Sequence, residues 1–86
     1  GVFGGGGSLK VWQDMTLSRW ALMPSEAGSL TLDSRRNYWV QVVKGDVILN
    51  GESLTTSDAL ALHQESLLSL QAQSAAEILI FDLPTV

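Results

Sequence analysis

Residues 40–62 read VQVVKGDVILNGESLTTSDALAL and carry the clearest structural signals of the chain. Asn50-Gly51 lies between two apolar runs, and this dipeptide is typical of a type I′ hairpin turn because both of its positions need a positive φ. Gly45-Asp46 and Ser57-Asp58 supply turn residues on either side of the hairpin. The stretch therefore predicts a strand, a tight hairpin and a further strand.

On both sides of this hairpin, apolar and polar side chains alternate with a period of two along most of the chain. The alternation predicts strands over residues 9–13, 16–23, 29–33, 38–43, 46–50, 60–62, 67–72 and 77–83. Residues 60–76 have helical propensity, yet Leu68 and Leu70 alternate with polar residues, which favours a strand there too. Many short strands at close spacing are typical of an all-β sandwich or barrel.

The composition of the 86 residues excludes several classes of protein. The chain has no cysteine, and its single histidine, His63, excludes a zinc site built of four His or Cys ligands. Five basic residues against nine acidic ones, a net charge of −4, predict no surface for nucleic acid or an anionic membrane. No apolar run approaches the roughly 20 residues of a membrane span. We therefore expect a cytoplasmic protein that binds neither nucleic acid nor membrane.

The start of the chain differs in composition from the rest. Residues 4–7 are all glycine and Ser8 follows them, so residues 1–8 are predicted to be a flexible linker or an artificial leader. Residues 9–86 are then one β domain, since a chain of this length builds one small core and not two. A chain that opens on a linker suggests a preceding domain, so we expect the C-terminal half of a two-domain protein.

Residues 40–62 resemble the middle of a cupin domain. In cupins a strand ends at a glycine, a hairpin follows, and a Gly-Asp-Ala type turn starts the next strand; here Gly45, Asn50-Gly51 and residues 57–59 have these places. Residues 13–15, 19–22, 39–45 and 81–84 resemble the C-terminal cupin of pirin-like bicupins, a family whose bacterial members include quercetin dioxygenases. The resemblance covers nearly all of the chain after Ser8 and implies a jelly roll of two antiparallel sheets.

The resemblance also implies where the metal ligands of a cupin would lie. Its two histidines, its glutamate and its last histidine fall on Leu32, Ser34, Tyr38 and Leu68, respectively, and a longer spacing would move the first two to Thr31 and Asp33. Among all of these, only Asp33 is a usual metal ligand. We therefore expect no metal, cofactor or catalytic residue in this chain, and a divalent transition metal in an N-terminal cupin outside it.

The aromatic residues predict an apolar outer surface. If Tyr38 points into the barrel, Trp39 points outward, because successive strand residues face opposite sides. The expected surface comprises Trp39, Gln41, Val43, Leu79 and Phe81. We expect an N-terminal cupin or a second subunit to cover it. The alternative is that residues 9–13 or the loop 33–37 fold over it.

The sequence therefore indicates a metal-free structural domain that supports an N-terminal metallocupin. The resemblance implies that this cupin would open the ring of a flavonol such as quercetin. An alternative is a small-molecule module in which Trp12, Trp20 or Tyr38 stacks on a flavonoid at the barrel mouth. A third hypothesis is a protein-interaction module, because the eukaryotic pirins are nuclear cofactors of transcription.

Overall fold

The computed structural model of the protein describes residues 15–84. The linker predicted over residues 1–8 and the strand predicted over residues 9–13 lie outside this part. Residues 15–84 form the strands β1 (Thr16–Leu22), β2 (Ala27–Thr31), β3 (Asn37–Lys44), β4 (Val47–Leu49), β5 (Glu52–Leu54), β6 (Ala59–His63), β7 (Leu67–Ala72) and β8 (Ala76–Leu83). Among these residues no helix is long and apolar enough to span a bilayer.

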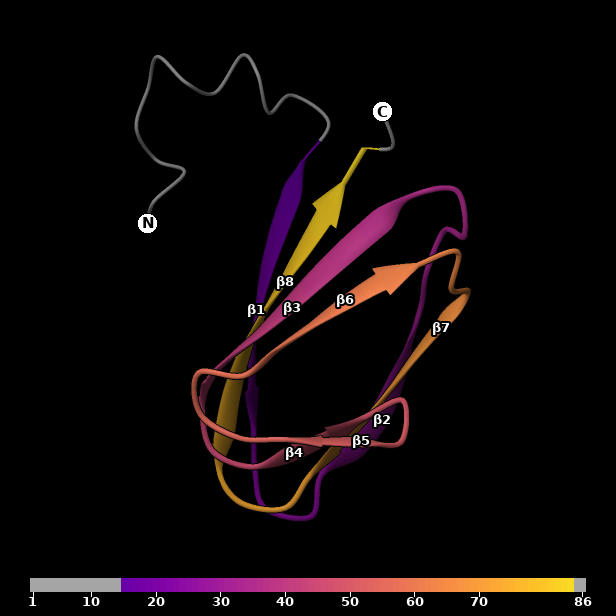
Figure 1. Ribbon diagram of the computed structural model, residues 1–86. Helices are drawn as coiled ribbons and strands as arrows, with labels where there is room; N and C mark the ends of the chain where they lie inside the picture. Colours follow the sequence, from indigo (N-terminus) through magenta and orange to yellow (C-terminus); the bar gives the residue numbers. More distant parts are fainter. Residues whose placement is uncertain (1–14, 85–86) are drawn as a thin grey trace, which may run out of the picture.

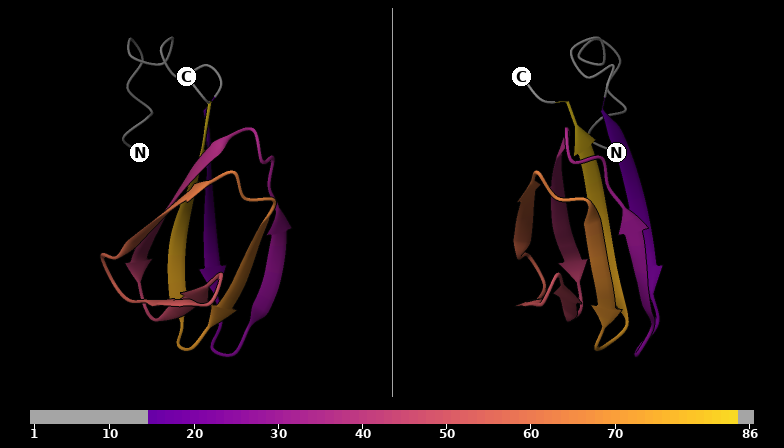
Figure 2. Two further views of the ribbon diagram at one scale, coloured as in Figure 1. Left: turned by 45° about the vertical axis from the view of Figure 1, so that its right-hand side comes forward. Right: turned by 90° about the vertical axis from the view of Figure 1, so that its right-hand side faces the viewer.

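The strands form two four-stranded antiparallel sheets that face each other (Figure 1). The first sheet has the order β1-β8-β3-β6 and the second the order β2-β7-β4-β5. Strands at opposite ends of the described chain, β1 and β8, lie side by side in the first sheet (Figure 2). The chain passes repeatedly from one sheet to the other, as in a jelly roll, so the predicted all-β fold is confirmed.

The hairpin and the ambiguous segment both fold as the sequence predicts. Asn50 and Gly51 have φ values of 48° and 83°, and they join β4 to the short strand β5. Residues 60–76 contain β6 and β7 and no helix, because β7 buries Leu68 and Leu70 on one face while its other face stays exposed. The strand predicted over residues 29–33 instead spans Ala27–Thr31, where it pairs with β7.

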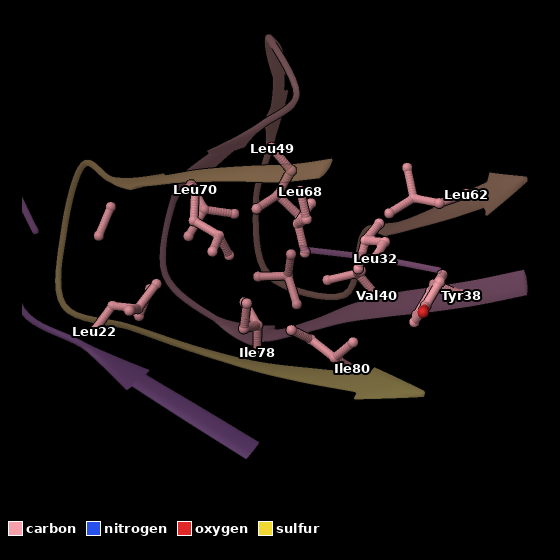
Figure 3. Close-up of a cluster of buried hydrophobic side chains, with 14 residues drawn as sticks. Leu22, Leu32, Tyr38, Val40, Leu49, Leu62, Leu68, Leu70, Ile78 and Ile80 are labelled. Atoms are coloured by element: carbon pink, nitrogen blue, oxygen red, sulfur yellow. The ribbon is translucent and has the colours of Figure 1, made fainter. Parts of the chain in front are cut away.

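The hydrophobic core lies between the two sheets and draws on both of them (Figure 3). The alternation along β3 places Tyr38, Val40 and Val42 inside, and that along β8 places Ile78 and Ile80 inside. The complete set of buried apolar residues in the described part is Leu22, Leu32, Tyr38, Val40, Val42, Val47, Leu49, Leu62, Leu68, Leu70, Ala72, Ala76, Ile78 and Ile80. Because the buried side chains of the described residues are apolar, their burial is the main source of stability.

Gly45 occupies the corner at which the chain leaves β3 in the first sheet for β4 in the second. Its φ is +91°, a value that side chains of L residues disfavour. A Cβ atom at this position would lie 2.4 Å from the carbonyl oxygen of Ala75 and 2.7 Å from the Cα of Ala76. Glycine is therefore required at this corner for its conformation and for its small size.

Candidate functional site

Three of the four residues at the implied ligand positions belong to the hydrophobic core. Leu32, Tyr38 and Leu68 are 5%, 7% and 0% exposed and lie among the other buried side chains (Figure 3). Leu32 directly follows β2, Tyr38 belongs to β3 and Leu68 to β7, so residues from both sheets meet at this place. Ser34 lies apart from them, exposed in the turn between β2 and β3.

The residues at these positions do not fit a metal centre. Leucine offers no lone pair, and the Tyr38 hydroxyl accepts a hydrogen bond from the backbone N–H of Asp33 at 2.8 Å. The longer spacing fits no better, because Thr31 is exposed and the Asp33 carboxylate binds the Arg35 side chain in the same loop. Leu32, Tyr38 and Leu68 therefore contribute to the hydrophobic core, and the two leucines supply no atom that could ligate a metal.

The loop between β2 and β3 closes the end of the sandwich near Tyr38. Arg36 pairs with Asp82, whose register partner on β3 is Tyr38 itself. Within the loop, the Asp33 carboxylate accepts two hydrogen bonds from the Arg35 guanidinium, from Nε to Oδ1 at 3.1 Å and from Nη2 to Oδ2 at 3.0 Å. Hydrogen bonds from the side chain and then the backbone of Arg35 lower the pKa of Asp33 to about 2. The loop thus contacts Tyr38 and Asp82 at this end of the sandwich.

Of the rings proposed to stack on a flavonoid, Trp20 and Tyr38 lie at different levels of the sandwich. Trp12 lies outside the described residues. Trp20 and Tyr38 both face the interior. Trp20 on β1 and Val42 on β3 both pair with Ile78 on β8, and Val42 lies four residues along β3 from Tyr38. That offset corresponds to about 13 Å. Trp20 packs against the core, and Tyr38 is a member of it.

The outer face of the first sheet carries a continuous row of apolar side chains that crosses all four strands. In register, Leu17 on β1 pairs with Phe81 on β8, Phe81 with Trp39 on β3, and Trp39 with Ala61 on β6. We call these four residues the outer row. Leu17 and Trp39 are 39% and 41% exposed, and Phe81 is half-buried. Sequence reasoning found Trp39 and Phe81 but missed Leu17 and Ala61, because only the strand order places β1 and β6 beside them.

The remaining predicted interface residues differ from one another. Leu79 is half-buried beside the outer row, and Val43 is 41% exposed at a register shift in β3. Gln41 is already used by the domain itself, because its Nε2 donates to the carbonyl oxygens of Ser57 and Asp58, each at 3.1 Å. Its Oε1 accepts from Nε1 of Trp39 at 3.3 Å and so steadies that ring.

Polar pairs flank the outer row on both sides. On one side the guanidinium of Arg19 pairs with the Glu77 carboxylate, and the pair lowers the pKa of Glu77. On the other side, Nδ1 of His63 lies 2.6 Å from Oδ1 of Asn37, its register partner. His63 is an exposed residue at the end of β6. The outer row is thus an apolar band between two polar pairs.

Comparison with known proteins identifies the family of this sandwich. The profile of the family described as the quercetinase C-terminal cupin domain matches residues 3–83. The chain belongs to this family. Quercetin 2,3-dioxygenase of Escherichia coli strain K12 is 50% identical to it over 80 residues, which cover 93% of this chain and 35% of that protein. The cupin domain described here thus spans about a third of the length of the curated relatives that it matches.

Solved structures agree with this assignment. The crystal structure of YhhW from Escherichia coli matches the quercetinase C-terminal cupin domain with a TM-score of 0.81 and 46% identity, over 84% of this chain and 31% of that one. A second structure of YhhW, described as a bacterial pirin in complex with nickel(II), matches with a TM-score of 0.80 over 84% of this chain and 31% of that one. The predicted membership in the pirin-like cupins is therefore confirmed.

Proposed function

We propose that this quercetinase C-terminal cupin domain is a structural, metal-free domain that packs against an N-terminal cupin carrying the metal and the catalytic site. The observation that supports this role most directly is the burial of Leu32, Tyr38 and Leu68 in one core, at the positions where the cupin resemblance puts ligands. A site filled by leucine side chains stabilises a fold but cannot hold a cation.

The proposal for the reaction of the whole protein is supported by relatives that are named quercetin 2,3-dioxygenases. We propose the metal-dependent oxygenolytic ring opening of a flavonol, with a divalent transition metal held by the N-terminal cupin. The domain described here supplies no reacting group and acts by supporting its neighbour. A cytoplasmic location belongs to the same proposal, since a cysteine-free chain suits a reducing compartment.

Elemental analysis of the purified 86-residue chain tests the metal-free state. We expect far less than one equivalent of iron, copper, nickel, manganese or zinc after dialysis against a chelator, because leucine and a hydrogen-bonded tyrosine are poor ligands. One equivalent that resists chelation would contradict the proposal. Nickel(II) titration of the apo chain, followed by the unfolding midpoint, gives a second measurement, since a metal bound only by the folded state would raise that midpoint.

The surface that contacts the N-terminal cupin is, in this proposal, the outer row. Large apolar side chains that stay exposed side by side on one face mark interaction sites more often than isolated ones do. Trp39 is the natural anchor, because tryptophan is enriched among the residues that dominate binding energy and its indole is steadied by Gln41. The N-terminal cupin is favoured as the occupant because about two thirds of the length of the Escherichia coli relative lies outside the part matched here.

The oligomeric state and dye binding of the chain test this surface. We expect a monomer by sedimentation that binds a hydrophobic fluorescent dye, with most of the binding lost in Trp39→Thr. Leu67→Thr is the matched control, because Leu67 is 48% exposed on the second sheet and lies outside the outer row. A dimer that buries Trp39 would contradict the N-terminal cupin as occupant. A monomer without dye binding, or equal losses in both variants, would contradict the surface itself.

A further inference from the structure

Asn50 at the tip of the β4–β5 hairpin makes three hydrogen bonds to β7. Its backbone N–H donates to the carbonyl oxygen of Ser69 at 3.0 Å. Its side-chain Oδ1 accepts from the backbone N–H of Ser69 at 2.7 Å, and its Nδ2 donates to the carbonyl oxygen of Leu67 at 3.1 Å. Asn50 is thus hydrogen-bonded to two residues of β7, Leu67 and Ser69.

The side-chain amide continues the ladder where the backbone of β4 leaves it. The last regular pair is Leu49 with Leu70, so Asn50 with Ser69 would be the next one. The positive φ of Asn50 starts the turn and takes its own carbonyl away from β7. A carboxamide has the donor and acceptor of a peptide group, so Oδ1 and Nδ2 replace the missing backbone partners. Asparagine is therefore required here for its amide as well as for its tolerance of positive φ.

Asn50 is followed in the chain by Gly51, and an asparagine before a glycine is prone to deamidation. A glycine has no Cβ to hinder attack by its own backbone nitrogen on the preceding side chain. When that nitrogen loses its proton and bonds to Cγ of Asn50, the Cγ–Nδ2 bond breaks and ammonia leaves. The resulting succinimide takes up one water and opens to aspartate or isoaspartate. The balance is one water consumed and one ammonia released.

We propose that Asn50 is a deamidation site that the docked hairpin suppresses and that, once it has reacted, releases the hairpin tip from β7. The reaction requires Cγ to turn toward the nitrogen of Gly51, whereas both side-chain bonds hold the amide on β7. The product lacks the Nδ2 donor and sets a carboxylate against the carbonyl oxygen of Leu67. Isoaspartate also lengthens the backbone by one carbon at the turn, which disturbs its register with Ser69.

Site-resolved mass spectrometry of the 86-residue chain in mildly alkaline buffer tests the suppression. We expect Asn50 to deamidate at least about tenfold more slowly in the folded chain than in urea, which corresponds to an opening free energy of about 1.4 kcal/mol. Asn37, followed by Tyr38, is the internal reference and should react little in either state. Equal rates at Asn50 in the folded and unfolded chains would overturn the proposal.

Hydrogen exchange in Asn50→Asp tests the release of the tip. The backbone amide of residue 50 should exchange at least about tenfold faster than in the parent, because the hairpin tip opens locally. The Ala72 amide, which donates to Glu26 on the other side of β7, should keep its protection. Unchanged protection at residue 50 would overturn the release. If this variant does not fold, the aged parent chain, with aspartate or isoaspartate formed in place, gives the same measurement.

Discussion

Gly45→Ala is expected to destabilise the protein by more than about 3 kcal/mol. A residue with a side chain pays about 1–2 kcal/mol for the positive φ alone. The new Cβ would also lie 2.4 Å from the Ala75 carbonyl oxygen and 2.7 Å from the Cα of Ala76. These are backbone atoms of the β7–β8 turn and of the first residue of β8, so they cannot rotate away as a side chain would. Urea unfolding of both proteins measures the loss.

Gly51→Ala is the matched control for this substitution. Gly51 also has a positive φ, +83°, but a Cβ there would meet no atom within 4 Å. The expected loss is therefore only the conformational cost, about 1–2 kcal/mol. Equal losses for the two variants would show that the contact between Gly45 and the β7–β8 turn has no energetic weight, contrary to the role that we assign to that corner.

Leu68→Ala is expected to cost about 3 kcal/mol, within the range of about 2–5 kcal/mol for leucine in a packed core. Leu68 is fully buried and stands where the cupin resemblance puts the last histidine ligand. Its removal leaves a cavity that both sheets line, and neither sheet can collapse without breaking its ladder. The midpoint of urea unfolding should therefore fall sharply, as expected of a position used for packing.

Two substitutions control for Leu68→Ala. Leu67→Ala makes the same chemical change one residue earlier on β7, on a side chain that is 48% exposed, and should cost about 0.5 kcal/mol. Ser34→Ala alters another implied ligand position that is exposed, and should change stability by less than about 0.5 kcal/mol. A loss for Leu68→Ala no larger than that for Leu67→Ala would contradict the packing role of this position.

The difference between Leu67 and Leu68 illustrates how much of the site the sequence could predict. The alternation in residues 67–72 and 77–83 showed which side chains share a face, and Tyr38 inside with Trp39 outside followed from the same rule. The outer row was only half found, because Leu17 and Ala61 belong to strands whose own patterns do not reveal their neighbours. The sequence also did not reveal that the Gln41 amide donates to the carbonyl oxygens of Ser57 and Asp58, because these residues are distant in the chain.

The sequence by itself determined the strand period, the Asn50-Gly51 turn and the cupin pattern, since these depend on residues close together in the chain. Only the tertiary structure decided which distant strands pair. It sets Leu17 beside Phe81, it brings Ala75 against Gly45, and it offers β7 to the amide of Asn50. The physical reason is that register between distant strands is fixed by the packing of the whole core, and no local pattern contains that information.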